Sequence, residues 1–191
     1  MMMKQAKVLS QKDISRVLKM LAGQRYSQRN RAIFLTSVYT GMRVGEIAAL
    51  RFEDVIDDTG AVRDEIRLSG AQTKGRSGRV VYLGHRAKRT LSEYVSTIVS
   101  RDPQSAFFLS QRTARDFAPN ALCQLMNGWF TEAGLLGATS HSGRRTFITE
   151  LANKGVSPHV LMALAGHKHL ATTQRYIENR PSLLHAAVNL V

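Results

Sequence analysis

Apolar residues recur at helical spacing along most of the chain. In the first such segment they lie three or four positions apart, at Ile14, Val17, Leu18 and Leu21. Ser10 precedes this segment as a candidate N-cap, Asp13 lies where a capping box needs an acidic residue, and Gly23 follows as a stop signal. We therefore predict a helix that begins after Ser10 and ends near Gly23.

The same pattern predicts further helices along the chain. We expect them over residues 28–40, 44–50, 91–98, 119–133, 140–154 and 158–165, with a short apolar helical tail after Pro181. Gly41 and Gly166 follow two of these segments and are typical helix ends. A last helix is expected to begin at Thr172 or Thr173 and to include Tyr176.

In the middle of the chain, the spacing of apolar residues changes from one typical of helices to one typical of strands. Residues 65–68 and 79–83 are typical of strands, and a basic, turn-rich connection over 73–78 joins them. Residues 106–109 are either a short buried strand or an apolar anchor within a loop. The pattern predicts a mainly α fold with a small antiparallel β-sheet (α+β), organised as a single domain over residues 1–191, with 1–9 flexible.

Composition narrows the class of protein. The 191 residues include 27 Lys and Arg against 14 Asp and Glu, which gives a formal net charge of +13, and 43% of the residues are hydrophobic. A globular chain with this charge favours a polyanionic partner, with nucleic acid first. Cys123 is the single cysteine, which excludes an intramolecular disulfide framework and fits a reducing compartment. No apolar run approaches the length of about 18 residues that a membrane span needs.

Two sites with charged residues stand out in the first half of the chain. Arg43 follows Gly41 and opens a predicted helix, and Glu46 lies three positions later on the same face. This pair either orients a neighbouring group or is an ordinary surface ion pair of little energetic value. Lys74 lies in the basic turn, where it either reaches a phosphate or is simply solvated.

Two further groups lie in the last third. His141 and Arg144 lie three positions apart where a helix begins, an arrangement that suits a phosphate but also fits a cap with a surface arginine. His167 follows a predicted helix end, and Tyr176 lies in a polar helical segment. A zinc site built on the histidines is disfavoured, because no carboxylate or cysteine lies at ligand spacing.

Taken together and in this order, these residues resemble the phage integrase family, also called the tyrosine recombinases. The family pattern is an arginine in T-G-x-R-x-x-E-x-x-x-L, a lysine in a β-hairpin, H-x-x-R, L-x-G-H and then a tyrosine. Here it reads Thr40-Gly41-Met42-Arg43 through Leu50, Lys74, His141-Ser142-Gly143-Arg144, Leu164-Ala165-Gly166-His167 and Tyr176. Many members have H-x-L-R-H, so Gly143 and Arg145 depart from the pattern and leave the His141 and Arg144 pair intact.

The resemblance implies a metal-independent DNA strand transferase with a tyrosine recombinase catalytic-domain fold and no cofactor. Tyr176 would attack a DNA phosphodiester and form a 3′-phosphotyrosine. Arg43 and Arg144 would hold the phosphate, His167 would add a hydrogen bond to it, His141 would act as general base, and Lys74 would protonate the leaving oxygen, with Glu46 in support. Further DNA contacts are expected at Arg76, Arg79, Arg145 and Lys168.

The family also implies partners and a setting. We expect double-stranded DNA, a homo-tetramer on DNA that is a monomer or weak oligomer without it, accessory DNA-bending proteins, no membrane, and a cytoplasmic, nucleoid-associated location in a prokaryote or phage. The DNA-clamping domain that usually precedes the catalytic domain is expected to be absent. The tail over 181–191 either docks on a neighbouring protomer, through an apolar patch of Leu183, Leu184, Val188 and Leu190, or folds back on its own core.

Two other functions remain open from the sequence. The same residues without strand exchange would give a type IB topoisomerase-like enzyme that relaxes supercoils. A DNA-binding regulator on the same fold would bind DNA without forming a covalent adduct. The main hypothesis is a site-specific recombinase or integrase, of the kind that mobile elements use.

Overall fold

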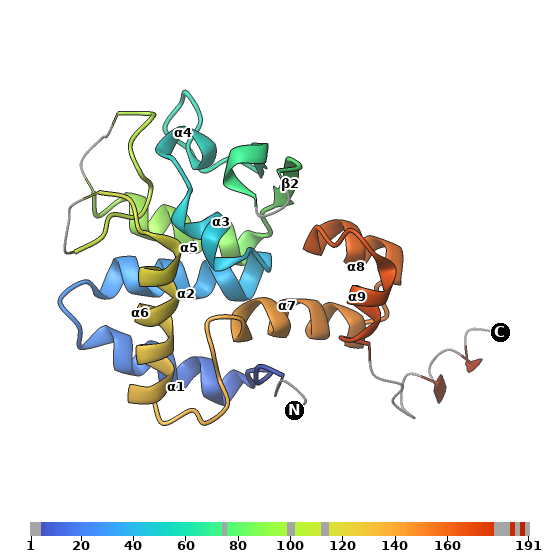
Figure 1. Ribbon diagram of the computed structural model, residues 1–191. Helices are drawn as coiled ribbons and strands as arrows, with labels where there is room; N and C mark the ends of the chain where they lie inside the picture. Colours follow the sequence, from blue (N-terminus) through green and yellow to red (C-terminus); the bar gives the residue numbers. More distant parts are fainter. Residues whose placement is uncertain are drawn as a thin grey trace.

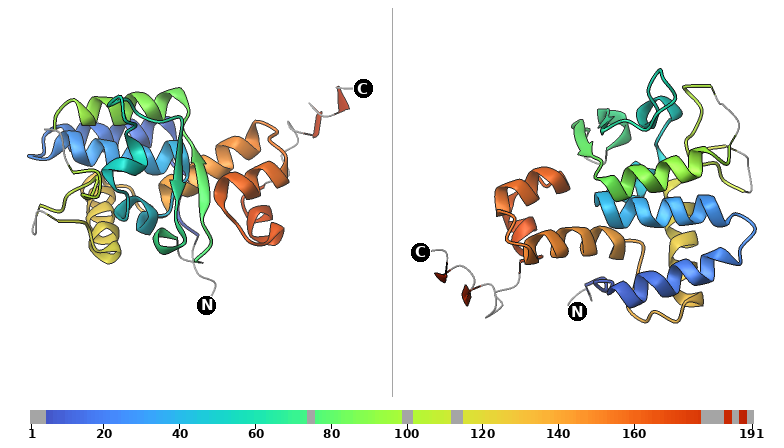
Figure 2. Two further views of the ribbon diagram at one scale, coloured as in Figure 1. Left: turned by 90° about the horizontal axis from the view of Figure 1, so that it is seen from above. Right: turned by 180° about the vertical axis from the view of Figure 1, so that it is seen from behind.

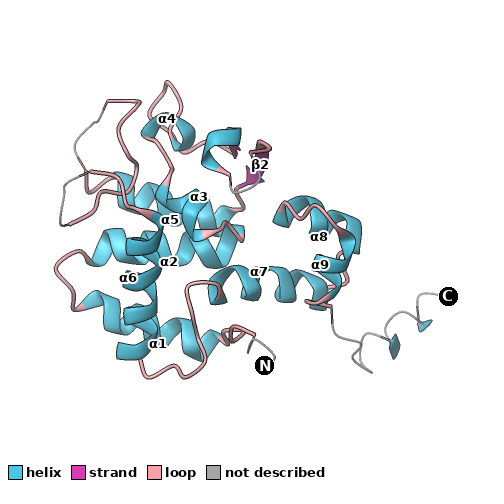
Figure 3. Cartoon of the chain, in the orientation of Figure 1, coloured by secondary structure: helices cyan, strands magenta, loops and turns pink. Residues whose placement is uncertain are grey.

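The computed structural model describes residues 5–73, 76–98, 102–111, 115–177, 184–185 and 188–189. Figure 1 shows a mainly helical chain, and Figure 3 shows that a small hairpin of strands lies at the edge of the helices. The elements are α1 (Gln11–Ala22), α2 (Ser27–Thr40), α3 (Val44–Ala48), α4 (Phe52–Val55), β1 (Glu65–Leu68), the 3-10 turn η1 (Gly70–Gln72), β2 (Arg79–Tyr82), α5 (His85–Val95), α6 (Pro119–Glu132), α7 (Ser142–Asn153), α8 (Pro158–Ala165) and α9 (Leu170–Gln174). The predicted fold class is therefore confirmed.

Helix α2 lies at the centre of the fold because its residues are apolar or small around most of its circumference. Ile33, Phe34 and Leu35 are consecutive and all buried, as expected for a helix covered on several sides. Its neighbours are α1, α3, α5 and α7. Figure 2 shows α1, α2 and α5 side by side, while α6 crosses them and α7 extends towards α8 and α9.

Local capping signals fix several helix ends. The Ser10 side chain accepts a hydrogen bond from the Asp13 backbone N–H, and the Asp13 carboxylate accepts one from the Ser10 N–H, so the predicted capping box is confirmed. Gly41 and Gly166 end α2 and α8 with left-handed backbones, at φ 64° and 60°. A residue with a Cβ adopts that conformation only at a cost, which explains glycine at both ends.

The strands pair as predicted. β1 and β2 run antiparallel, with Glu65 opposite Tyr82 and Leu68 opposite Arg79. Residues 106–109 are the loop anchor and not a strand. Ala106 and Leu109 lie in isolated β-bridges, opposite Arg51 and Asp116. Phe107 and Phe108 between them are buried against Tyr94.

Several predicted boundaries are wrong. The expected helix at 44–50 stops at Ala48, the one through 91–98 stops at Val95, and both α4 and η1 were not expected. Helix α7 begins at Ser142 with His141 as its N-cap, instead of at residue 140. Helix α9 begins at Leu170, because His169 is extended and its carbonyl accepts from the Thr172 N–H.

As a result, Tyr176 lies just after α9 and not within it. The expected tail is described only in part: Leu184 and Val188 are exposed, and Pro181, Leu183 and Leu190 lie outside the described residues. Among the described residues, no helix is long and apolar enough to cross a membrane.

Candidate active site

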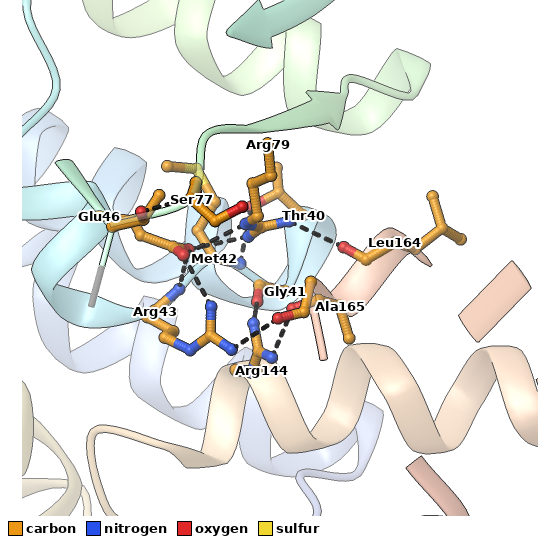
Figure 4. A network of polar contacts seen from close by, with 12 residues as sticks. Thr40, Gly41, Met42, Arg43, Glu46, Ser77, Arg79, Arg144, Leu164 and Ala165 are labelled. Atoms are coloured by element: carbon orange, nitrogen blue, oxygen red, sulfur yellow. Dashed lines mark hydrogen bonds and ion pairs between the residues drawn. The ribbon is translucent and has the colours of Figure 1, made fainter. Parts of the chain in front are cut away.

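Two helix ends and two arginines meet at one place in the fold. Arg144 projects from α7 and is only 6% exposed. Its guanidinium donates to the Gly41 carbonyl at 2.7 Å and to the Ala165 carbonyl at 2.6 Å, so it bridges the ends of α2 and α8 (Figure 4). Arg43 follows the end of α2 and donates to the Gly166 carbonyl at 2.9 Å. The structure thus brings together two arginines that lie 101 positions apart in the sequence.

These two arginines still have donors to offer. An arginine carries five N–H groups. Among the described residues, Arg43 donates two of them to Glu46 and Gly166, and Arg144 donates two to Gly41 and Ala165. Burial, together with the positive charge of Arg43, lowers the pKa of Arg144 to about 10. Arg144 therefore remains a cation at neutral pH, and the pair is suited to hold a phosphate.

Glu46 lies beneath the arginines and is only 1% exposed. Its carboxylate accepts from the Arg43 backbone and side chain, at 2.8 and 2.9 Å, and from two nitrogens of Arg79, at 3.1 and 2.8 Å. Burial by itself would raise the pKa of Glu46, but the hydrogen bonds and charge of Arg79, with those of Arg43, hold it below its usual value. The interpretation of Arg43 and Glu46 as a surface pair is wrong, because the carboxylate is buried.

Arg79 lies in β2 and turns inwards. Its side chain is 9% exposed, and besides Glu46 it donates to the Leu164 carbonyl at 2.9 Å. The sequence predicts a DNA contact at Arg79. The guanidinium also donates to three oxygens of the protein, two of Glu46 and one of Leu164, so Arg79 joins parts of the fold as well. No local pattern could have found those partners, because Leu164 lies 85 positions away.

His167 and Tyr176 lie against each other. Their rings stack with centroids 5.7 Å apart and planes inclined by 22°. The His167 Nδ1 atom is 3.0 Å from the Thr173 hydroxyl. Burial lowers the pKa of His167 to about 4, and the positive charges of Arg144, Arg43 and Arg79 add to the shift. His167 is therefore neutral at neutral pH, and its ring nitrogens are suited to hydrogen bonds and not to an ion pair.

His141 and Arg145 belong to the same turn as Arg144. His141 is exposed at the N-cap of α7. The Arg145 backbone N–H donates to its carbonyl. The Arg145 guanidinium lies over the Tyr176 ring, 5.8 Å from the centroid, a distance at which a cation is attracted to an aromatic face. One turn of α7 thus reaches both the arginine bridge and the tyrosine.

An open pocket of about 500 Å³ lies beside these groups, lined by Arg43, Arg79, His167, Lys168 and residues of the hairpin such as Thr73 and Ser77. Lys168 and Arg76 are exposed. Lys74 lies outside the described residues. Within the part of the chain that the structure describes, no three His, Cys, Asp or Glu side chains gather closely enough to hold a metal ion.

The Phage integrase family model matches residues 7–182 of this chain. The chain belongs to the phage integrase family. A curated relative is "Tyrosine recombinase XerD" of Oceanobacillus iheyensis, 30% identical over 175 residues, which cover 88% of this chain and 56% of the relative.

Two solved structures have the same fold as this chain. The crystal structure of XerA recombinase matches with a TM-score of 0.74 at 25% identity, over 96% of this chain and 64% of that one. The Tn1549 transposon integrase, solved in complex with a circular intermediate DNA, matches with a TM-score of 0.76 at 15% identity, over 100% of this chain and 67% of that one. This phage integrase chain spans about half the length of the curated relatives it matches.

Proposed function

We propose that this chain cuts and rejoins double-stranded DNA at specific sites, with Tyr176 as the nucleophile. The observation that carries the proposal is the convergence around Gly166. Arg43 and Arg144 bind Gly166 and Ala165, His167 follows at once, and the Tyr176 ring stacks on His167. A phosphate at this place would meet two cations, a neutral imidazole and a phenol.

The proposed reaction is a transesterification. The Tyr176 phenolic oxygen forms a bond to phosphorus and gives up its proton, while the bond from phosphorus to the 5′-oxygen breaks. The products are a 3′-phosphotyrosine and a 5′-hydroxyl, which takes up a proton. Attack on the phosphotyrosine by a 5′-hydroxyl from a second duplex reverses the step and exchanges the strands. No nucleotide cofactor is needed, because the covalent link retains the energy of the phosphodiester.

Each group has a distinct proposed role. Arg43 and Arg144 hold the non-bridging oxygens and stabilise the charge that develops in the pentavalent transition state. These guanidiniums supply the positive charge that a metal ion supplies in other phosphoryl-transfer enzymes, so we propose a metal-independent reaction. His167 donates a hydrogen bond to the phosphate, His141 accepts the tyrosine proton, and Lys74 donates the proton to the leaving oxygen.

We also propose the setting in which the reaction takes place. The net charge of +13 suits a DNA partner, and the Tn1549 integrase was solved bound to DNA. By family analogy, four copies act on two duplexes with the help of DNA-bending proteins, and the tail after residue 181 joins neighbouring copies. The natural location is then the cytoplasm beside the nucleoid, and residues 1–191 act as one catalytic domain.

The test uses nicked duplexes in which the sequence around the nick is randomised. The nick lets the short fragment that carries the new 5′-hydroxyl diffuse away, so the covalent protein–DNA adduct is trapped. Wild-type protein is expected to give a denaturation-resistant protein–DNA band, and Tyr176→Phe is expected to give none. Tyr82→Phe is the matched control, since Tyr82 is 61% exposed on β2. A band that persists in Tyr176→Phe would overturn the assignment of the nucleophile.

Two other outcomes would replace the proposed function. DNA binding by the wild-type protein with no adduct on any duplex would indicate a regulator. Relaxation of supercoiled plasmid without exchange between two duplexes would indicate a topoisomerase-like enzyme. A recombinase is expected to require paired sites.

A further inference from the structure

The end of helix α8 is held by arginines from three different elements. Its last carbonyls have no partner within the helix and form the negative end of the helix dipole. Each of three consecutive carbonyls accepts from one arginine: Leu164 from Arg79 in β2, Ala165 from Arg144 in α7, and Gly166 from Arg43 before α3. The position of the segment that carries His167 is therefore set by three side chains, of which only two belong to the proposed phosphate site.

Arg79 differs from the other two in its surroundings. It binds both oxygens of the Glu46 carboxylate with Nε and Nη2, and its Nη1 reaches Leu164. The same carboxylate also binds Arg43. Arg79 thus joins three elements in one rigid fork, namely the hairpin, the start of α3 and the end of α8. Figure 4 shows this fork between Glu46 and Leu164.

Gly166 gives an independent indication that this contact is built into the fold. A Cβ on residue 166 would lie 2.5 Å from Arg79 Cδ, closer than real Cβ atoms approach a neighbour. The backbone there also has a φ of +60°, which favours glycine by itself. The glycine before His167 therefore both turns the chain and leaves room for the Arg79 stem.

We propose that Arg79 is a positioning residue for the strand-cleavage reaction. It fixes Glu46, and through Glu46 the guanidinium of Arg43. It also fixes the end of α8, and through it His167 and the stacked Tyr176. This role rests on the proposed function, and it does not require Arg79 itself to touch the DNA phosphate.

The experiment compares Arg79→Gln and Arg79→Lys with Arg67→Gln. Arg67 lies on the neighbouring strand and its side chain is 80% exposed, so this control removes the same charge outside the site. Adduct formation is measured in single turnover at saturating nicked DNA, with the rate corrected for the folded fraction, and DNA affinity is measured separately. Arg79→Gln is expected to slow adduct formation about 100-fold, the cost of a small misplacement of reacting groups, with unchanged affinity. Arg67→Gln should match the wild type.

A second readout needs no activity. In DNA-free protein, the imidazole of His167 is titrated by NMR. Loss of the Arg79 charge is expected to make His167 titrate at a higher pH, because the positive charge of Arg79 contributes to the lowered pKa of this imidazole. Arg79→Lys retains a cation beside Glu46 and leaves the titration near that of the wild type. Lysine cannot bind Glu46 and Leu164 together, so Arg79→Lys should still cleave more slowly than the wild type.

The outcomes separate this proposal from the proposed function. If Arg79→Gln cleaves at the wild-type rate per folded molecule, or loses affinity as strongly as rate, Arg79 is not a positioning residue. If Arg79→Gln does not fold, the rate and affinity of Arg79→Lys decide in the same way. If the wild type itself forms no adduct, the proposed function is overturned, and an unchanged His167 titration in Arg79→Gln would then overturn the positioning role as well.

Discussion

Gly143 of α7 lies directly against Ser37 of α2. A Cβ on residue 143 would lie 2.1 Å from the Ser37 Oγ and 3.1 Å from its backbone carbonyl carbon. The Ser37 hydroxyl is itself held by a hydrogen bond to the Phe34 carbonyl at 2.7 Å. The two helices can therefore approach this closely only with glycine at 143. The next residue is Arg144, so this contact sets how far that arginine reaches towards the end of α2.

We expect Gly143→Ala to lower the stability of the protein. The added methyl group would push α7 away from α2, and overpacking of this kind costs about 1–3 kcal/mol. The measurement is the free energy of unfolding by urea. Gly128→Ala is the matched control, because Gly128 lies inside α6 and a Cβ there meets nothing within 4 Å. That control is expected to gain roughly 0.5–1 kcal/mol from helix propensity alone. Equal effects of the two substitutions would contradict the close contact.

Gly143 also shows which structural features the sequence alone does not predict. The sequence predicts features that depend on residues close together in the chain, such as the capping box of Ser10 and Asp13 and the helix end at Gly41. Gly143 was visible only as a departure from the family pattern, because its partner Ser37 lies in another helix. The inward turn of Arg79 towards Leu164 was hidden for the same reason.

Helix α9 shows that the sequence alone also does not determine where a helix begins. Thr172 and Thr173 are good capping residues, and the sequence favoured them as the start of the helix. The structure begins the helix at Leu170, because Gly166 reverses the chain and leaves His169 extended as the N-cap. Thr173 is then free to bind His167 from inside the helix. The preceding turn thus determines which residue caps α9. Because the helix begins and ends earlier than the sequence predicts, Tyr176 lies after it and not within it.

Arg144→Lys is expected to lose most of the strand-cleavage activity and to retain most of the DNA affinity. A lysine cannot donate to Gly41 and Ala165 at once while it also holds a phosphate. Loss of a donor that stabilises the transition state costs roughly 10²–10³-fold in rate. Adduct formation on nicked duplexes and equilibrium binding are measured side by side, with Arg67→Lys as the control for an exposed arginine. A parallel loss of binding and cleavage would instead make Arg144 a general DNA contact.

DNA affinity is expected to fall steeply with salt. A chain with a net charge of +13 releases counterions when it covers phosphates, so the logarithm of affinity decreases linearly with the logarithm of salt concentration. Lys168→Gln and Arg76→Gln should each reduce that slope by about 1 if the side chain contacts a phosphate. Fluorescence anisotropy between low and physiological salt measures it. A flat response of the wild type would argue against DNA as the partner.

The buried, neutral imidazole of His167 should make the protein less stable in acid. The pKa of His167 is about 4 in the folded protein, against 6.5 as its ordinary value. Between these two values the unfolded chain binds the proton and the folded chain does not, so the free energy of unfolding decreases as the pH falls from 6.5 to 4. Below pH 4 both states are protonated and this contribution stays lost.

His167→Gln removes this contribution, so the stability difference between wild type and variant should change across that window. Urea unfolding at a series of pH values measures it, and His159→Gln, which removes an exposed histidine of α8, is the control. Curves for wild type and His167→Gln that stay parallel from pH 6.5 to 4 would mean that the imidazole is not held neutral. His167 would then bind a phosphate as a third cation beside Arg43 and Arg144. The proposed role, by contrast, is that of a neutral hydrogen-bond donor whose ring is held by the stacked Tyr176 and by Thr173.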